Sequence, residues 1–182
     1  MLRIEGYAIV SADGMLADAS GVMPATLKFD ADQRFFESAL ELADLIVHGR
    51  NSFEDQPHSA LRRRLVVTRR IPALAPDPGN PKATLWNPAG ASFADACAAA
   101  GVVAGSAAII GGGDVFGMFL DRYDTFWLSR ASHVRLPGGV PVFPGVPAQS
   151  PAHILAAHGL RAEPPRVLDE AGGVTLTAWQ RA

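Results

Sequence analysis

Ala108-Ile109-Ile110-Gly111-Gly112-Gly113-Asp114-Val115-Phe116 is the stretch on which the interpretation of this chain depends. It has the pattern of a short apolar strand that ends at three glycines and is followed by the start of an amphipathic helix. Glycine is favoured where the backbone takes a conformation closed to other residues, or where another group approaches it closely. The free N–H groups at the start of a helix suit a phosphate. A tight strand-to-helix turn without a ligand fits the same residues, so the rest of the chain must decide.

Composition restricts the classes of protein to which the chain can belong. It has 182 residues, 48% hydrophobic and 19% charged, which is typical of a globular protein with a substantial core. A net charge of −2 gives no electrostatic case for nucleic-acid binding. The one cysteine, Cys97, excludes an internal disulfide, and the five histidines show no metal-ligand spacing, so no metal is expected. With no signal-peptide pattern and no membrane-spanning apolar run, we expect a cytoplasmic protein without membrane contact.

Apolar periodicity predicts strands that alternate with helices. Strands are predicted over Ile4–Val10, Leu45–His48, Arg64–Thr68, Ala83–Trp86, Ala107–Ile110, Thr125–Ser129 and Val174–Trp179. Helices are predicted from Asp30 or Asp32 to Ala43, over Asn51–Gln56, from Ser92 to Ala100 and over Val115–Leu120, while His153–His158 fits a strand or a short helix. Loops are predicted over Ala17–Thr26, Ile71–Lys82 and Val134–Pro151. The pattern predicts one domain over residues 1–182, an α/β sandwich with a mostly parallel central sheet and an antiparallel C-terminal edge.

Three of the predicted strands end in residues that suit a phosphorylated ligand. These ends are Gly49-Arg50-Asn51-Ser52, Thr68-Arg69-Arg70 and Gly111-Gly112-Gly113. Ligands of parallel sheets bind outside the carboxyl ends of the strands, and arginines and hydroxyls there can pair with phosphate. Solvated loop arginines are the ordinary alternative for each end taken alone. The two commonest nucleotide motifs, G-x-G-x-x-G and the P-loop, are absent.

The carboxylates Asp30 and Asp32 lie at the start of the helix before the second strand. Either can cap that helix. Either can also stand at a pocket wall, where a carboxylate binds the amidine-like edge of a heterocycle and supports proton transfer. The residues alone leave both readings open.

The order of these features resembles the dihydrofolate reductase superfamily, which includes the reductase domain of riboflavin biosynthesis. The resemblance spans Ile4 to Trp179. It is carried by Ser11-Ala12-Asp13-Gly14, Leu45-Ile46-Val47-His48-Gly49-Arg50-Asn51-Ser52-Phe53-Glu54, Ile109-Ile110-Gly111-Gly112-Gly113-Asp114-Val115-Phe116 and Val142-Phe143-Pro144. It implies the three-layer sandwich of that superfamily and an NADPH-dependent reductase. Riboflavin-type reductases are accompanied by a zinc deaminase, and this chain lacks the deaminase motif.

The resemblance also implies a set of cofactor contacts. Gly49, Arg50, Asn51 and Ser52 match the segment at the pyrophosphate and 2′-phosphate, and Thr68, Arg69 and Arg70 match the segment beside the adenosine 2′-phosphate. Two arginines there favour NADPH over NADH. Gly111, Gly112 and Gly113, with Asp114 and Val115, match the residues packed on the pyrophosphate and nicotinamide, and the family has a cis peptide that would fall at Gly111–Gly112. Ala8 and Ile9 match the strand that lines the nicotinamide.

On the substrate side the resemblance assigns fewer residues. Asp32 matches the pocket carboxylate, with Asp30 as the second choice; Phe36 matches a residue that packs on the substrate ring, and Arg63 one that holds the carboxylate of a folate tail. Three positions depart from the family pattern: Ala25 replaces a tryptophan, Phe116 replaces a tyrosine, and Pro141 stands where a threonine hydroxyl is expected to support the carboxylate.

These assignments predict hydride transfer from NADPH to a C=N bond of a pterin-like substrate. Two alternatives stay open: a 5-amino-6-(5-phosphoribosylamino)uracil reductase of riboflavin biosynthesis, and a non-catalytic nucleotide-binding protein with the same fold. The partners expected are a small-molecule substrate and, from the apolar edge strand and the riboflavin-type resemblance, a second copy in a homodimer.

Overall fold

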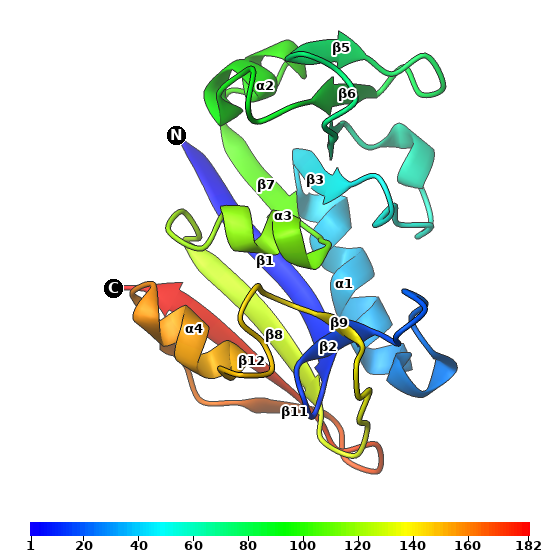
Figure 1. Ribbon diagram of the computed structural model, residues 1–182, viewed down its shortest axis with the longest axis vertical. Helices are drawn as coiled ribbons and strands as arrows, with labels where there is room; N and C mark the ends of the chain where they lie inside the picture. Colours follow the sequence, from blue (N-terminus) through cyan, green and yellow to red (C-terminus); the bar gives the residue numbers. More distant parts are fainter.

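The computed structural model describes residues 1–182 and is built around one large twisted sheet (Figure 1). The strand order is β10-β12-β8-β1-β7-β3-β4-β6-β5, and β11 pairs with β12. Its strands are β1 (Leu2–Ser11), β3 (Leu45–Gly49), β4 (Arg64–Val67), β5 (Leu74–Pro76), β6 (Ala83–Trp86), β7 (Gly105–Ile109), β8 (Thr125–Ala131), β10 (Leu160–Ala162), β11 (Arg166–Asp169) and β12 (Val174–Arg181). A small second sheet pairs β2 (Met15–Ala17) with β9 (Val140–Pro141).

Helices cover both faces of the large sheet and make three layers. Helix α1 (Asp30–Leu42) packs on one face through a cluster that joins Leu40 to Ile46 and Ala108. Helices α2 (Phe93–Ala99), α3 (Gly113–Met118) and α4 (Pro151–Ala157) contribute to the larger cluster, which covers the other face. Two short 3-10 turns, η1 (Ala25–Leu27) and η2 (Ser59–Leu61), complete the elements. No helix is long and apolar enough to cross a membrane.

The direction of the strands confirms the predicted sheet. Six neighbouring strands run parallel: β8, β1, β7, β3, β4 and β6. Parallel neighbours need crossover connections, and helices or long segments of chain provide them here. The strands β12 and β10 form the antiparallel C-terminal edge. The opposite edge is also antiparallel, since β5 turns back on β6 within the proline-rich segment that was expected to be irregular.

Local sequence explains where two of the four α-helices begin. The Ser92 hydroxyl accepts from the Asp95 amide and the Asp95 carboxylate accepts from the Ser92 amide, which makes a capping box at α2. Ser150 caps α4, with Pro151 in the first turn, so the ambiguous segment near His153 is a helix. The predicted helix over Asn51–Gln56 is wrong: that segment is irregular.

A gap opens in the sheet where β7 ends. Strand β1 pairs with β7 only as far as Gly6, opposite Ile109, and β3 pairs with β7 as far as Val47, opposite the same residue. Beyond Ile109 the chain leaves the sheet at the glycines. The second half of β1 and the end of β3 therefore face each other across a space that no central strand fills.

Candidate functional site

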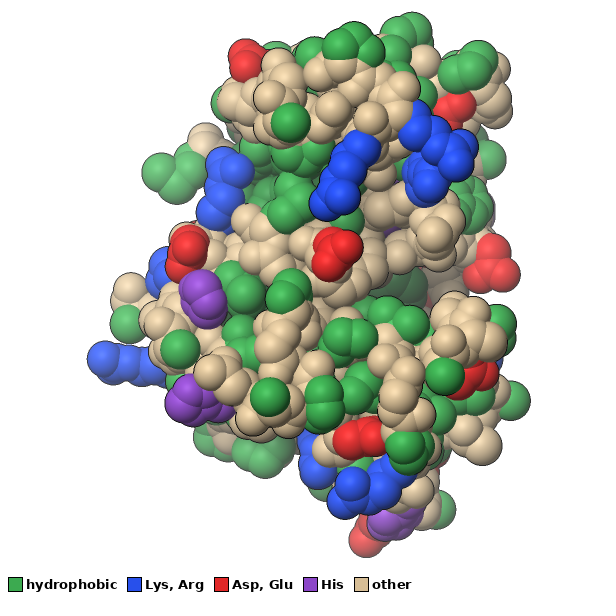
Figure 2. All heavy atoms as spheres, viewed as in Figure 1, with side chains coloured by type: hydrophobic (Ala, Val, Ile, Leu, Met, Phe, Trp, Pro, Cys, Tyr) green, Lys and Arg blue, Asp and Glu red, His purple; other side chains and the backbone are tan.

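The space beyond β7 is the mouth of a large cleft with a volume of about 1180 Å³. Single small-molecule sites have volumes of about 300–1,000 Å³, so this cleft has room for two ligands side by side. Figure 2 shows a hollow on this side of the molecule, with Lys and Arg side chains gathered above it. The walls come from β1, the first half of α1, the segment after β3, the end of β4, α3 and β8.

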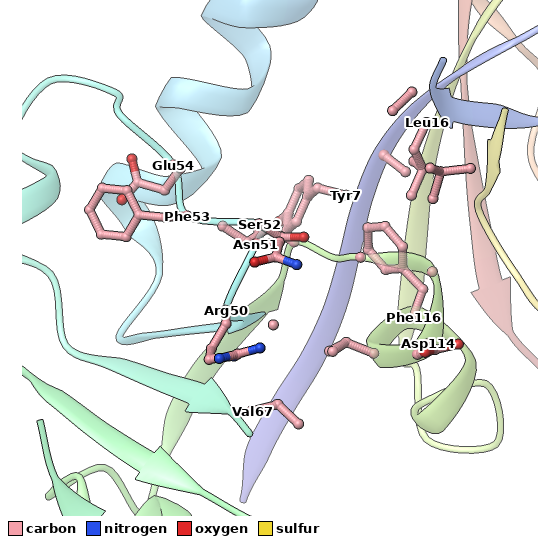
Figure 3. Close-up of a pocket in the computed structure, with 18 of the residues that line it drawn as sticks. Tyr7, Leu16, Arg50, Asn51, Ser52, Phe53, Glu54, Val67, Asp114 and Phe116 are labelled. Carbon is pink, nitrogen blue, oxygen red and sulfur yellow. The ribbon is translucent and has the colours of Figure 1, made fainter. Parts of the chain in front are cut away.

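One end of the cleft is cationic. Arg50 follows β3, and Arg69 and Arg70 follow β4, the neighbouring parallel strand; all three line the cleft. Thr68 is buried, and its hydroxyl accepts a hydrogen bond from the Arg70 amide at 3.2 Å, which shapes the turn that carries both arginines. Asn51 and Ser52 line the same region, and Figure 3 shows them beside Arg50. Guanidinium, amide and hydroxyl groups together form a donor set that suits phosphate.

Two of the three glycines are required, each for a different structural reason. Gly111 has φ of +118°, a conformation that side chains rarely adopt, and its carbonyl accepts from the Gly49 amide at 2.7 Å. A Cβ on Gly113 would lie 2.3 Å from the Pro141 carbonyl oxygen, so glycine is needed there because the chain itself approaches closely. The peptide between Gly111 and Gly112 is cis, as the resemblance implied. Gly112 and Gly113 line the cleft, with Asp114 and Val115 of α3, whereas Gly111 lies behind them.

A carboxylate stands at the other end of the cleft. Asp32, in the first turn of α1, lines the cleft, and burial raises its pKa above the ordinary value, although a hydrogen bond with the Ser129 hydroxyl acts in the opposite direction. Neither Asp32 nor Asp30 caps α1, because the N-cap residue is Phe29 and no side chain bonds there. Asp30 does not line the cleft. The structure therefore distinguishes the two carboxylates, which the sequence left open.

Ser129 corrects the expectation about Pro141. The family pattern places a hydroxyl that supports the carboxylate at position 141, where this chain has proline. The structure places Pro141 in β9, against Gly113, and the hydroxyl that lowers the pKa of Asp32 comes instead from Ser129, a buried residue of β8 that lines the same cleft. The sequence reasoning missed Ser129 because a serine within an apolar strand has no local pattern that marks it.

Aromatic side chains surround Asp32. Tyr7 pairs in register with Trp127 on the adjacent strand, and Ile9 pairs with Ser129 two residues further along. Phe35 of α1 packs on both rings, with its centroid 6.1 Å from that of Tyr7 and 5.4 Å from that of Trp127. Phe36 lines the cleft as expected, as do Ala8 and Ile9; Tyr7, Phe35 and Trp127 were not expected. Figure 3 shows Tyr7 extending from β1 into the cleft.

Arg63 does not reach the cleft. Its guanidinium donates to the carbonyl oxygen of Gly101, just after α2, at 2.9 Å, and Arg63 lies at the opposite end of β4 from the cleft. The expected contact of Arg63 with a substrate carboxylate is therefore not supported by its position. Successive side chains in an extended segment point to opposite faces. A residue that matches the family pattern by its position in the sequence can therefore still point away from the site.

The arginines that flank Arg63 belong to a buried ion cluster. Glu54 accepts from Arg64 Nη2 at 2.8 Å and from Arg62 Nη1 at 3.1 Å, and the side chains of Glu54 and Arg64 are only 3% and 1% exposed. Arg64 Nη1 also donates to His48 Nε2 at 3.2 Å. Because Glu54 belongs to the segment after β3, this cluster fixes the segment that carries Arg50, Asn51 and Ser52.

The other departures lie at the margins of the site. Phe116 lines the cleft and is buried against Phe126, with the ring centroids 5.4 Å apart. Ala25 is exposed in η1 and does not line the cleft. No group of three or more His, Cys, Asp or Glu side chains is placed to hold a metal ion.

Comparison with solved structures shows which fold this arrangement belongs to. A riboflavin biosynthesis protein from a Shewanella species superposes with a TM-score of 0.67 at 22% identity, covering 99% of both chains. A diaminohydroxyphosphoribosylaminopyrimidine deaminase/5-amino-6-(5-phosphoribosylamino)uracil reductase from Thermotoga maritima gives 0.68 at 14% identity, and this chain spans 56% of it. Dihydrofolate reductase from Enterococcus faecalis, complexed with NADP(H) and RAB-propyl, gives 0.65 at 17% identity, covering 98% of this chain and 96% of that one.

Comparison by sequence gives no family: no family model and no curated protein matches the chain. The fold is that of dihydrofolate reductase, as the sequence motifs indicated.

Proposed function

We propose that this chain, with its dihydrofolate reductase-like fold, is an NADPH-dependent reductase that acts on a C=N bond of a pterin-like heterocycle. The proposal depends on one observation: a single cleft has a triple-arginine end and, at the other end, the partly buried carboxylate of Asp32 near the Ser129 hydroxyl. A dinucleotide phosphate and a heterocycle with an amidine edge need these two chemistries in one continuous space.

The cationic end fits the phosphates of NADPH. Arg50, Arg69 and Arg70 supply three positive charges, and Ser52 and Asn51 supply neutral donors. Neighbouring guanidinium groups suit a phosphate dianion, which NADPH carries on its ribose and NADH does not. Gly112, Gly113, Asp114 and Val115 would line the path to the nicotinamide, beside Ala8 and Ile9 of β1. When bound, NADPH supplies the hydride.

The chain's own residues would orient the substrate and manage its charge. The Asp32 carboxylate can accept two hydrogen bonds from an amidine edge, and the nearby Ser129 hydroxyl favours its ionised form. Burial of Asp32 raises its pKa, which strengthens its tendency to hold a proton next to the substrate. Phe36 and Trp127 provide apolar walls for a planar ring.

The pyrimidine reductase of riboflavin biosynthesis is the alternative, and one observation favours it. A folate tail carries carboxylates, and the arginine expected to hold one of them, Arg63, is bonded to Gly101 outside the cleft. A substrate without such a tail would lose nothing from this arrangement. The cytoplasm, where NADPH and both substrates occur, is the location we propose.

Two measurements test the proposal. Calorimetric titration with NADPH and NADH should show tighter binding of NADPH, and Arg69→Ala should reduce the difference by about tenfold, the scale of one charged hydrogen bond. NADPH oxidation followed by absorbance, with dihydrofolate and the phosphoribosylamino-pyrimidinone in parallel, identifies the substrate. Absence of binding of either nucleotide contradicts the proposal. Binding without oxidation by either substrate indicates a non-catalytic nucleotide-binding protein.

A further inference from the structure

Tyr7 separates the large cleft from a second, smaller cavity. That cavity has a volume of about 90 Å³ and lies between the start of β1, the end of α1 and the start of β7. Its walls include Glu5, Ala39 and Ala107, and Tyr7 is the one residue that also lines the cleft. The Tyr7 side chain is thus a partition with space on both sides.

A largely buried acceptor, the carboxylate of Glu5, holds this partition in place. The Tyr7 hydroxyl donates to Glu5 Oε2, and the Trp127 indole N–H donates to the same oxygen at 3.2 Å. The other carboxylate oxygen of Glu5 pairs with Arg3 Nε at 2.6 Å, and the Glu5 side chain is 12% exposed. Glu5 does not line the cleft. Because Glu5 accepts from both Tyr7 and Trp127, it links these two cleft-lining rings outside the cleft and restricts the rotation of both.

The partition lies at the carboxylate end of the cleft. Tyr7 and Trp127 are two residues along their strands from Ile9 and Ser129, and alternate residues of a strand share a face. Asp32 and Ser129 line the same part of the cleft, where the Ser129 hydroxyl lowers the pKa of Asp32, and Phe35, one helical turn after Asp32, packs on Tyr7 and Trp127. A group attached to the amidine edge of a heterocycle on Asp32 would therefore meet the Tyr7 ring.

We infer that Tyr7 is a specificity-determining residue, held by the positioning residue Glu5, and that it restricts the substrate to heterocycles whose amidine edge carries an unsubstituted amino group. This inference rests on the proposed function, because it assumes that Asp32 binds an amidine edge. Removing the ring would join the cavity to the cleft. A cavity of about 150 Å³ is enough to bind benzene, so the vacated ring space plus the small cavity should accept a phenyl group.

The test uses two binding probes on the full chain: 2,4-diaminopteridine and its 2-benzylamino derivative, both titrated by calorimetry. We expect the wild type to bind the unsubstituted probe at least about tenfold more tightly, since overpacking is costly. Tyr7→Ala should shift the ratio of the two dissociation constants by about tenfold or more toward the benzylamino probe. Tyr7→Phe and Glu5→Ala, which keep the ring and remove its tether, should shift it in the same direction by a smaller factor. Glu163→Ala, at an exposed glutamate of the C-terminal region, is the matched control and should leave the ratio unchanged.

The ratio distinguishes this role from a merely structural one, because both probes are measured on the same folded fraction of each variant. If the wild type binds the unsubstituted probe and the ratio is the same in Tyr7→Ala, the inference is wrong while the proposed function stands. If the wild type binds neither probe, the inference and the amidine-binding role of Asp32 are both overturned. Equal binding of both probes by the wild type also overturns the inference.

Discussion

Glu54→Gln should be among the most damaging single substitutions in this protein. The carboxylate of Glu54 is the one acidic group that contacts Arg64, whose side chain is 1% exposed, whereas Arg62 also pairs with Glu41 at 2.8 Å. Glutamine keeps the shape and an acceptor oxygen but removes the charge. Leaving a buried charge without its partner costs about 3–5 kcal/mol of the free energy of unfolding.

The expected loss can be converted into a melting temperature. For a domain of this size, 1 kcal/mol corresponds to a shift of about 2–4 °C, so Glu54→Gln should lower Tm by about 6–20 °C. Calorimetry and urea unfolding at pH 7 measure it. Glu41→Ala is the matched control, because Glu41 contacts the same Arg62 from an exposed position and should have a much smaller effect.

A double variant tests the reasoning directly. If the cost arises from an unpaired Arg64, then Arg64→Met combined with Glu54→Gln should be more stable than the sum of the two single losses predicts. The reasoning is refuted if Glu54→Gln costs less than about 1 kcal/mol, or if the two losses simply add. If NADPH binds as proposed, Glu54→Gln should also weaken its binding, since Glu54 anchors the segment that carries Arg50 and Ser52.

Three more substitutions test individual features of the structure. Burial raises the pKa of Asp32, so the folded protein loses stability as pH rises through the folded-state pKa and the carboxyl ionises. Asp32→Asn should therefore have a higher Tm than the wild type at pH 8, and the difference should vanish near pH 4. An unchanged Tm at pH 8 would contradict this. Burial lowers the pKa of His48, so stability should fall as pH drops below about 6.5, and His48→Gln should show a shallower loss in urea melts between pH 7.5 and 5.5. Gly111 has φ of +118°, and a Cβ there would lie 3.2 Å from the Phe116 ring, so Gly111→Ala should lower the free energy of unfolding by about 1–3 kcal/mol. Gly79 has no positive φ, and a Cβ there would meet only Asp77 at 3.5 Å, so Gly79→Ala should be nearly neutral in the same unfolding assay.

The local sequence was sufficient for most of the strands and for the cationic end of the cleft. Apolar runs such as Leu45–His48 are buried whichever neighbour they pair with, so their pattern alone identifies them as strands. Arg50, Arg69 and Arg70 follow directly after strands, and the carboxyl ends of parallel neighbours meet at one edge. Their convergence therefore follows from chain order. The loop expected over Ile71–Lys82 contains a strand, β5, because pairing with β6 outweighed the proline signals.

The carboxylate end depended on tertiary structure. The resemblance favoured Asp32 over Asp30 without excluding either, and only the packing of α1 on the sheet places Asp32 in the cleft and leaves Asp30 outside it. The same holds for the three consecutive arginines: Arg62 and Arg64 are paired with Glu54, and Arg63 points away to Gly101.

The triple glycine shows where sequence and tertiary structure divide. The sequence by itself determined that the strand before Gly111 must end and that the backbone there takes a conformation suited to glycine, because these are local properties of the chain. Only the tertiary structure decided why two of the glycines are needed: Gly111 for its positive φ, and Gly113 for the close approach of Pro141, about thirty residues later in the chain. Close approaches between distant segments depend on how the layers pack, and no local pattern of residues encodes them.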